Sequence, residues 1–125
     1  MGARLRRMKP YHPRRRGKRI DSHKQALHDL KHRLSSDIGS FIVLLKQGDQ
    51  QQIVQAQQKA KSDYLKHSMD MQKIAQQMGE KYVKIVREYL DSIDQIIYTT
   101  SLWIDDAKVR NCYIMSERFD KEIVA

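Results

Sequence analysis

The sequence has little of what stabilises disulfide-bonded or metal-bound small proteins, because cysteine occurs once, at Cys112. A single thiol excludes an internal disulfide and a zinc site built from several cysteines. Proline occurs only at Pro10 and Pro13, and three glycines follow residue 20: Gly39, Gly48 and Gly79. Since proline and glycine interrupt helices, their scarcity after residue 20 favours long helices over that part of the chain.

Long apolar runs are also missing. The longest uninterrupted run, residues 41–45, is far shorter than the ~20 residues that cross a bilayer, so we expect no transmembrane segment. The chain also has no glycine-rich phosphate loop and no nucleophile beside a base. We therefore predict no enzyme activity, no catalytic residue, no cofactor and no small-molecule substrate.

Positive charge, in contrast, is concentrated at one end. The first 20 residues hold nine of the 24 basic side chains and no acidic one, so the other 105 residues hold 15 of each sign. The formal net charge of +9 is therefore that of a basic arm on a neutral body. Because its charges repel and it has almost nothing apolar to bury, the arm cannot fold alone and needs a polyanion. A nucleic acid is the partner that this pattern favours, duplex DNA over RNA.

We expect the arm, residues 1–20, to be extended, because its two prolines disfavour a helix. Tyr11 and His12 lie between two arginine clusters, where they could stack on bases or donate to phosphates. Nothing in the arm is typical of base-edge readout, so we expect binding without sequence preference. The predicted nucleic-acid contacts in the arm are Arg4, Arg6, Arg7, Lys9, Tyr11, His12, Arg14, Arg15, Arg16, Lys18 and Arg19.

Apolar side chains recur at helical spacing through the rest of the chain, residues 21–125. A capping box at Ser22 and Gln25 predicts a helix start, Gly39 is a possible break, and Gly48 ends the helix. The capping pair Asp49 and Gln52 starts the next helix. The first apolar stripe is Leu27, Leu30, Leu34, Ile38, Phe41 and Leu45, and the second is Ile53, Ala56, Ala60, Tyr64, His67, Met71, Ile74 and Met78.

A third helix follows Gly79 and is the most apolar, with a possible end near residues 99–101. A weaker fourth segment reaches Ile123. Their apolar positions are Tyr82, Ile85, Val86, Tyr89, Leu90, Ile93, Ile96, Ile97, Thr100, Ile104 and Ala107, and then Val109, Cys112, Tyr113, Phe119 and Ile123. The fold class we predict is all-α, an extended basic arm followed by a bundle of three to four helices.

One flank of the first predicted helix is basic, since Lys24, His28 and Lys31 lie beside its apolar stripe with His32 and Lys46. Lys24, His28 and Lys31 are predicted to continue the contact surface of the arm; an ordinary solvated helix face is the alternative. Residues 28–32, His-Asp-Leu-Lys-His, resemble a zinc motif. Aspartate stands there in place of the glutamate and a third ligand is missing, so we predict no metal site. His67 is predicted to be a hydrogen-bonded core or interface histidine.

In layout, this basic arm at residues 4–19 and the helical segments from Ser22 to Ile123 resemble the major capsid proteins of archaeal filamentous and rod-shaped viruses with linear double-stranded DNA. The resemblance implies a helix bundle that packs into a helical filament around DNA, within a virion, as paired or heterodimeric subunits. The weakly apolar second stripe fits this implication, because it suits a subunit interface better than a monomer core.

Two other functions fit the same features. A ribosomal or mitoribosomal protein could thread the arm into structured RNA, and a dimeric nucleoid-type protein could bind DNA with a finite oligomeric state. Either would be intracellular and associated with nucleic acid. A nuclear import signal in residues 13–19 or a solubilising tail are further interpretations of the arm.

Overall fold

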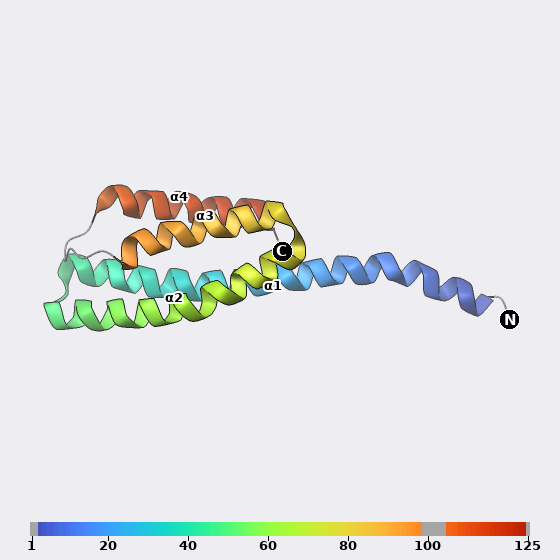
Figure 1. Cartoon of the computed structure of the whole chain (residues 1–125), viewed down its shortest axis with the longest axis horizontal. Helices are drawn as coiled ribbons and strands as arrows, with labels where there is room; N and C mark the ends of the chain where they lie inside the picture. The colour runs from blue at the N-terminus through green and yellow to red at the C-terminus, as the bar shows by residue number, and fades with distance from the viewer. Residues whose placement is uncertain (1–2, 99–104, 125) are drawn as a thin grey trace.

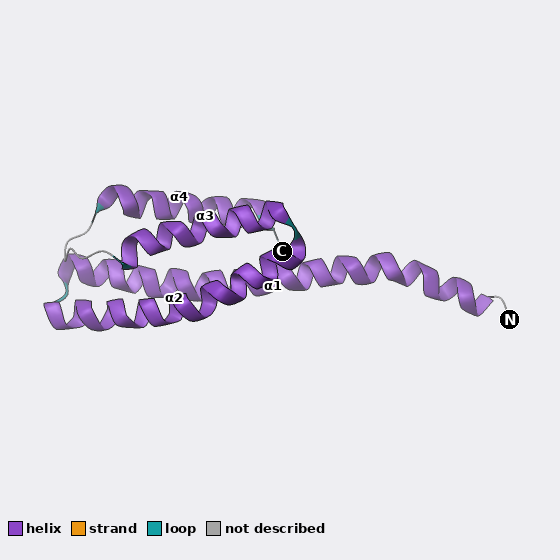
Figure 2. Cartoon of the chain, viewed as in Figure 1, coloured by secondary structure: helices purple, strands orange, loops and turns teal. Residues whose placement is uncertain are grey.

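The computed structural model describes the backbone of residues 3–98 and 105–124, and the side chains of residues 21–98 and 105–124. Four helices and no strand occur in this described part of the chain. They are α1 (Ala3–Gln47), α2 (Gln50–Met78), α3 (Glu80–Ile97) and α4 (Asp106–Glu122). The prediction of an all-α helix bundle is therefore confirmed (Figure 2).

The helices run alternately up and down the bundle (Figure 1). Consecutive helices pack on one another, α1 on α2, α2 on α3 and α3 on α4, as short connections require of antiparallel neighbours. The N-terminal part of α1 projects beyond the bundle end where α2 meets α3 (Figure 1). The N-terminal part of α1 therefore leaves the bundle at the α2–α3 junction, and the α1–α2 connection lies at the opposite end.

Both ends of α2 lie at predicted capping residues. Asp49 caps α2 by accepting from the backbone N–H of Gln52 at 2.8 Å, and the Gln52 side chain accepts in return from the Asp49 backbone N–H at 3.2 Å. Gly79 is the single residue between α2 and α3, with φ of +126° and ψ of 168°. An L side chain rarely adopts this conformation, so the sharp reversal depends on glycine.

Two features of α1 differ from the expectations. Its assigned bounds begin at Ala3, whereas the sequence favours an extended backbone up to residue 20 and a helix start at Ser22. The helix also runs unbroken through Gly39, because the neighbouring turns are held by buried Ile38 and Phe41.

The core lies between all four helices and follows the predicted stripes closely. Val86, Ile93 and Ile97 of α3 are completely buried, which confirms α3 as the most apolar helix. The buried apolar side chains are Leu27, Leu34, Ile38, Phe41, Ile42, Ile53, Ala60, Met71, Ala75, Ile85, Val86, Tyr89, Leu90, Ile93, Ile96, Ile97, Cys112, Phe119 and Ile123.

The last segment forms a helix of its own, α4, with Asp105 as its N-cap. Cys112, Phe119 and Ile123 are buried as predicted, but Tyr113 is 58% exposed. Tyr113 follows Cys112 directly, and successive helical side chains point about 100° apart, so the two cannot share one narrow face. The predicted apolar positions Thr100 and Ile104, and a helix end at residues 99–101, lie outside the described residues.

Candidate nucleic-acid interface

The side chains of the basic arm, residues 1–20, lie outside the part that the structure describes. The contacts predicted for residues 4–19 therefore stay predictions that rest on sequence. The three predicted contacts on the bundle, Lys24, His28 and Lys31, can be placed. Two of them are engaged by α4.

Lys31 lies in the seam between α1 and α4. Its side chain is 11% exposed, and its Nζ lies 2.9 Å from Oδ2 of Asp120 on α4. The same Nζ lies 5.9 Å from the ring centroid of Tyr89 and 6.0 Å from that of Phe119. The ammonium group loses its bound water on burial, and the carboxylate and the two aromatic rings offset the free-energy cost of that loss. Lys31 is thus part of the helix packing.

His28 binds the C-terminal end of α4 to α1. Its Nε2 is hydrogen-bonded to the backbone carbonyl of Ile123, and its Nδ1 lies 3.6 Å from Oδ1 of Asp120. The imidazole ring also meets the Phe119 ring edge to face, with 5.5 Å between the centroids. Because the carbonyl of Ile123 follows the last turn of α4, His28 satisfies one of the acceptors that a helix end leaves free.

The predicted basic flank is therefore interrupted, since Lys31 is buried and the part-buried His28 binds α4. Lys24 is half-buried and has no ion pair with another described residue, and His32 and Lys46 are exposed. A helical projection gives the direction of a flank but not which helix packs against it. Here α4 covers the middle of the flank, and its Asp120 was not among the residues that sequence singled out.

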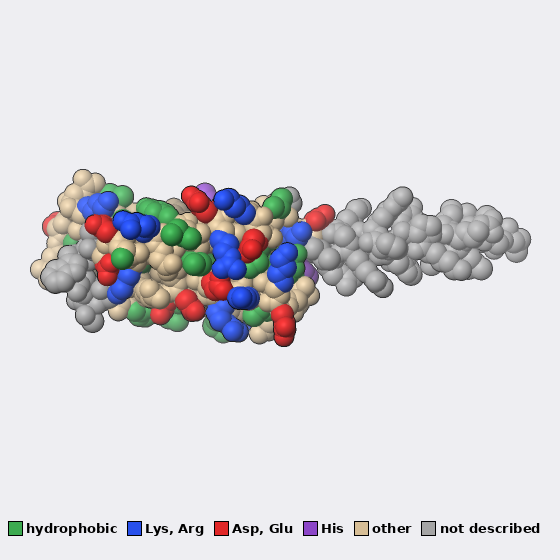
Figure 3. Space-filling view, turned by 90° about the horizontal axis from the view of Figure 1, so that it is seen from above, with side chains coloured by type: hydrophobic (Ala, Val, Ile, Leu, Met, Phe, Trp, Pro, Cys, Tyr) green, Lys and Arg blue, Asp and Glu red, His purple; other side chains and the backbone are tan. Residues whose placement is uncertain are grey.

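The outer surface of the bundle is electrically mixed. In the view of Figure 3, lysine and arginine side chains alternate with aspartate and glutamate over the described part of that face. Some of these charges pair between helices. Arg118 of α4 binds Glu88 of α3, and its Nε also lies 3.1 Å from Oε2 of Glu122.

A pair of carboxyl groups lies across the seam between α1 and α2. Burial, with a hydrogen bond and repulsion from Asp63 of α2, raises the pKa of Asp37 to about 6, and Lys59 partly opposes the rise. The Nζ of Lys59 lies 3.9 Å from Oδ1 of Asp37. Two carboxylates in one half-buried site repel each other. The pair therefore binds a proton more tightly than two separate carboxyl groups do.

Histidine and tyrosine side chains complete the polar interior. His67 is 7% exposed, as predicted for a core or interface histidine. Its Nδ1 has no hydrogen-bond partner among the described residues. The hydroxyl of Tyr89 is 2.6 Å from Oγ of Ser35 on α1. Tyr64 donates to the carbonyl of Leu90 at 3.2 Å, and burial raises the pKa of Tyr64 to about 12.

The described residues contain no group of three or more histidine, cysteine, aspartate or glutamate side chains arranged to hold a metal ion. Among the same residues, no helix is long and apolar enough to cross a membrane. No protein-family model, curated protein or solved structure matches the chain.

Proposed function

We propose that this chain is a non-enzymatic nucleoprotein subunit that binds duplex DNA without sequence preference and assembles into a helical filament, as a viral capsid protein does. Residues 1–20 are the binding segment, and residues 21–125 are the packing unit. The observation that carries the proposal is the separation of charge: nine basic and no acidic side chains precede residue 21, and equal numbers of each follow it.

The charges of the arm are opposite in sign to those of a phosphate backbone, and their number corresponds to a short stretch of duplex. Duplex DNA carries one negative charge per ~1.7 Å of its axis, so nine cations would neutralise about 15 Å, or four to five base pairs. Lysine and arginine contacts to phosphates position a protein but read no sequence. The absence of a base-reading pattern in the arm supports binding to any duplex.

The bundle supports this division of roles. Its core is built from apolar side chains of all four helices, and Lys31 is already paired with Asp120 within the chain. With Lys31 and His28 used in packing, the arm and the half-buried Lys24 carry the proposed contacts. The assembly half of the proposal rests on the resemblance in layout to filamentous capsid proteins and on large apolar side chains left exposed on the bundle, Leu65 and Met69 among them.

Electron microscopy of the purified full chain with linear duplex DNA tests the proposal. We expect uniform filaments with a regular helical repeat that appear only when DNA is present. The control is the full chain with Arg14, Arg15 and Arg16 changed to Gln, which keeps the length of the arm but removes three cations. This variant should form fewer filaments at the same salt concentration.

The other outcomes point to the other functions. Bare DNA beside discrete particles that bind structured RNA would overturn the DNA-filament proposal in favour of a ribosomal role. A finite dimer that prefers one DNA sequence would overturn it in favour of a nucleoid-type protein.

A further inference from the structure

One column of exposed side chains on the outer face of α2 carries no charge. Its members follow one another at alternating spacings of four and three residues, and every one of them is exposed. They are Gln51, Gln55, Gln58, Ser62, Leu65, Met69, Gln72 and Gln76. Although 31% of the residues of the chain are charged, this column stays uncharged over about 38 Å of a helix that rises ~1.5 Å per residue.

The outer faces of the two following helices are charged instead. On α3 the exposed positions at the same alternating spacings are Glu80, Lys84, Arg87 and Asp91. On α4 four exposed charged side chains occupy the corresponding face, and they are Asp106, Arg110, Glu117 and Lys121. The uncharged column of α2 therefore differs from the faces that α3 and α4 turn to solvent.

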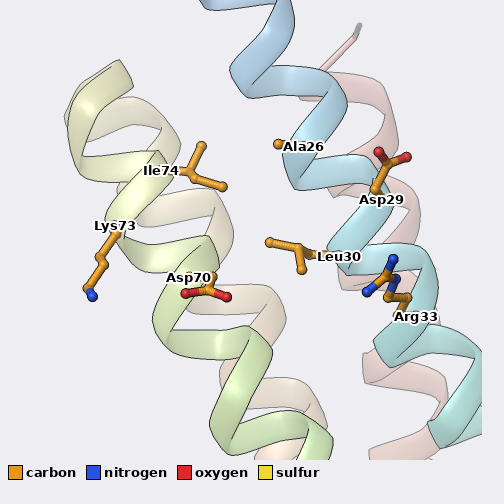
Figure 4. A pocket seen from close by; sticks show the side chains of 7 residues that line it. All are labelled: Ala26, Asp29, Leu30, Arg33, Asp70, Lys73 and Ile74. Atoms are coloured by element: carbon orange, nitrogen blue, oxygen red, sulfur yellow. The ribbon is translucent and has the colours of Figure 1, made fainter.

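The charged side chains of α2 lie on the flanks of the column, and several of them are used within the bundle. Lys59 and Asp63 interact with Asp37 of α1. Asp70 lines the groove between α1 and α2, which Figure 4 shows with the side chains that line it. These three charges therefore lie on the flank of α2 that faces α1.

The other charges of α2 are also kept out of the column. Lys66 and Lys73 follow Lys59 at intervals of seven residues, which places them along the same flank. On the opposite flank, the Nζ of Lys61 lies 5.2 Å from the ring centroid of Tyr98 of α3. The outermost surface of α2 is left to glutamine, serine, leucine and methionine.

We propose that the uncharged column of α2 packs against the same column of a second copy of the chain. Spacings of four and three residues average 3.5, the repeat at which two helices stay in contact along their length. Leu65 and Met69, which are 58% and 60% exposed, supply apolar contact near the middle of the column. Glutamine amides both donate and accept hydrogen bonds, so two identical glutamine-rich columns can satisfy each other.

The absence of charge selects a second copy over a polyanion or a charged protein surface. The column offers no cation to a phosphate and no counter-charge to an ion pair, so a charged partner would lose water there without compensation. Two copies related by a two-fold axis present identical faces to each other. Identical faces that carry charges of one sign repel, whereas identical uncharged faces do not.

This inference deepens the assembly half of the proposed function by naming one subunit contact, and it rests on that half alone. The experiment is therefore done on the full chain without nucleic acid, by sedimentation over a range of protein concentrations. One variant combines Gln58→Glu with Gln72→Glu, and a second combines Gln58→Lys with Gln72→Lys. The two positions lie seven residues on either side of Leu65, so an axis near Leu65 brings like charges together in either helix orientation.

We expect the unchanged chain to form a dimer. The dissociation constant of the dimer should rise about tenfold or more for each variant alone, because like charges then face each other across the contact. An equimolar mixture of the two variants should recover the dimer, with one copy of each. The control combines Gln47→Glu with Gln95→Glu, two exposed glutamines on α1 and α3, and should leave the dimer unchanged.

A disulfide readout tests the same contact without added charge. Leu65→Cys, oxidised and separated on a non-reducing gel, should give a linked dimer in several-fold excess over Ile114→Cys on α4, a position of similar exposure at 53%. Cys112 is buried, so it is protected from the reaction.

A full chain that sediments as a monomer would overturn this inference. So would a dimer that the control weakens as much as the column variants do, a mixture that recovers no dimer, or equal disulfide yields from the two cysteine variants. None of these results alters the proposed binding of the arm to DNA, so the two proposals fail separately.

Discussion

The basic arm and the helical bundle use the same kinds of side chain for different purposes. In residues 1–20 nine cations have no acid beside them, so their neutralising partner must come from outside the segment. In the bundle, Lys31 is as cationic as any arginine of the arm, yet Asp120 and two aromatic rings hold it in a helix seam. The comparison teaches that a basic side chain indicates nucleic acid only where the chain itself offers it no counter-charge.

The largest expected effect comes from separating the two regions. A chain of residues 21–125 should keep its helical circular dichroism, because it retains every buried residue of the core that the structure describes, from Leu27 to Ile123. Its affinity for duplex DNA at physiological salt should fall by roughly a thousandfold or more, since the phosphate contacts dominate such binding. Fluorescence anisotropy with a labelled duplex measures the loss. Retained affinity would mean that the bundle carries the binding.

Within the bundle, the next largest effect is expected at Asp120. Changing Asp120→Ala leaves the ammonium of Lys31 buried without its carboxylate, which should lower the free energy of unfolding by about 1–3 kcal/mol. Urea denaturation measures the change. Glu117→Ala, an exposed acid on the same helix, is the matched control and should stay within about 0.5 kcal/mol of the unchanged chain. Equal losses would show that Lys31 gains nothing from Asp120.

Substitution by alanine should change the stability of the chain in opposite directions at two glycines. Gly79 has a φ of +126°, so Gly79→Ala should destabilise the bundle by about 1–2 kcal/mol through backbone strain. An added Cβ at Gly39 meets no atom within 4 Å, and alanine is the better helix former, so Gly39→Ala should stabilise α1 by about 0.5–1 kcal/mol. Thermal unfolding of both variants checks the signs. A shift in the same direction for both would contradict this account of the two sites.

A comparably small effect, which depends on pH, concerns the carboxyl pair between α1 and α2. The pKa of Asp37 rises from 3.8 to about 6 on folding, so the folded chain binds the proton more tightly. Stability should therefore fall as the pH rises through this window and stay level above it. Asp37→Asn removes the dependence and should stabilise the chain at neutral pH by about 1 kcal/mol, after allowing for screening by solvent.

Urea titrations at pH 4 and pH 7 measure this effect, and the gain from Asp37→Asn should be larger at pH 7. Asp91→Asn on the exposed face of α3 controls for the loss of one charge. A gain that is the same at both pH values would mean that Asp37 titrates normally in the folded chain.

The parts of the fold that depend on local sequence were predictable. The capping box at Asp49, the stop at Gly48 and the reversal at Gly79 follow from residue types, and the apolar stripes identify most of the core.

The contacts of the predicted interface on the bundle depend on tertiary packing. Sequence periodicity places Lys31 beside the apolar stripe of α1, but it cannot show that α4 returns along that flank with Asp120 in register. An acid and a base 89 positions apart carry no local signal of their pairing. The charge of the arm, in contrast, is visible from the sequence alone, because it depends on no contact within the chain.

The salt dependence of DNA binding tests the division between arm and bundle most directly. The affinity of the full chain for a linear duplex is measured over a range of salt concentrations, beside the full chain with Arg14, Arg15 and Arg16 changed to Ala. Each lost phosphate contact lowers the log–log slope by about 0.9, so the triple variant should have a slope smaller by roughly 2.7 on every duplex sequence. An unchanged slope would contradict the account, because the arm would then make none of these contacts.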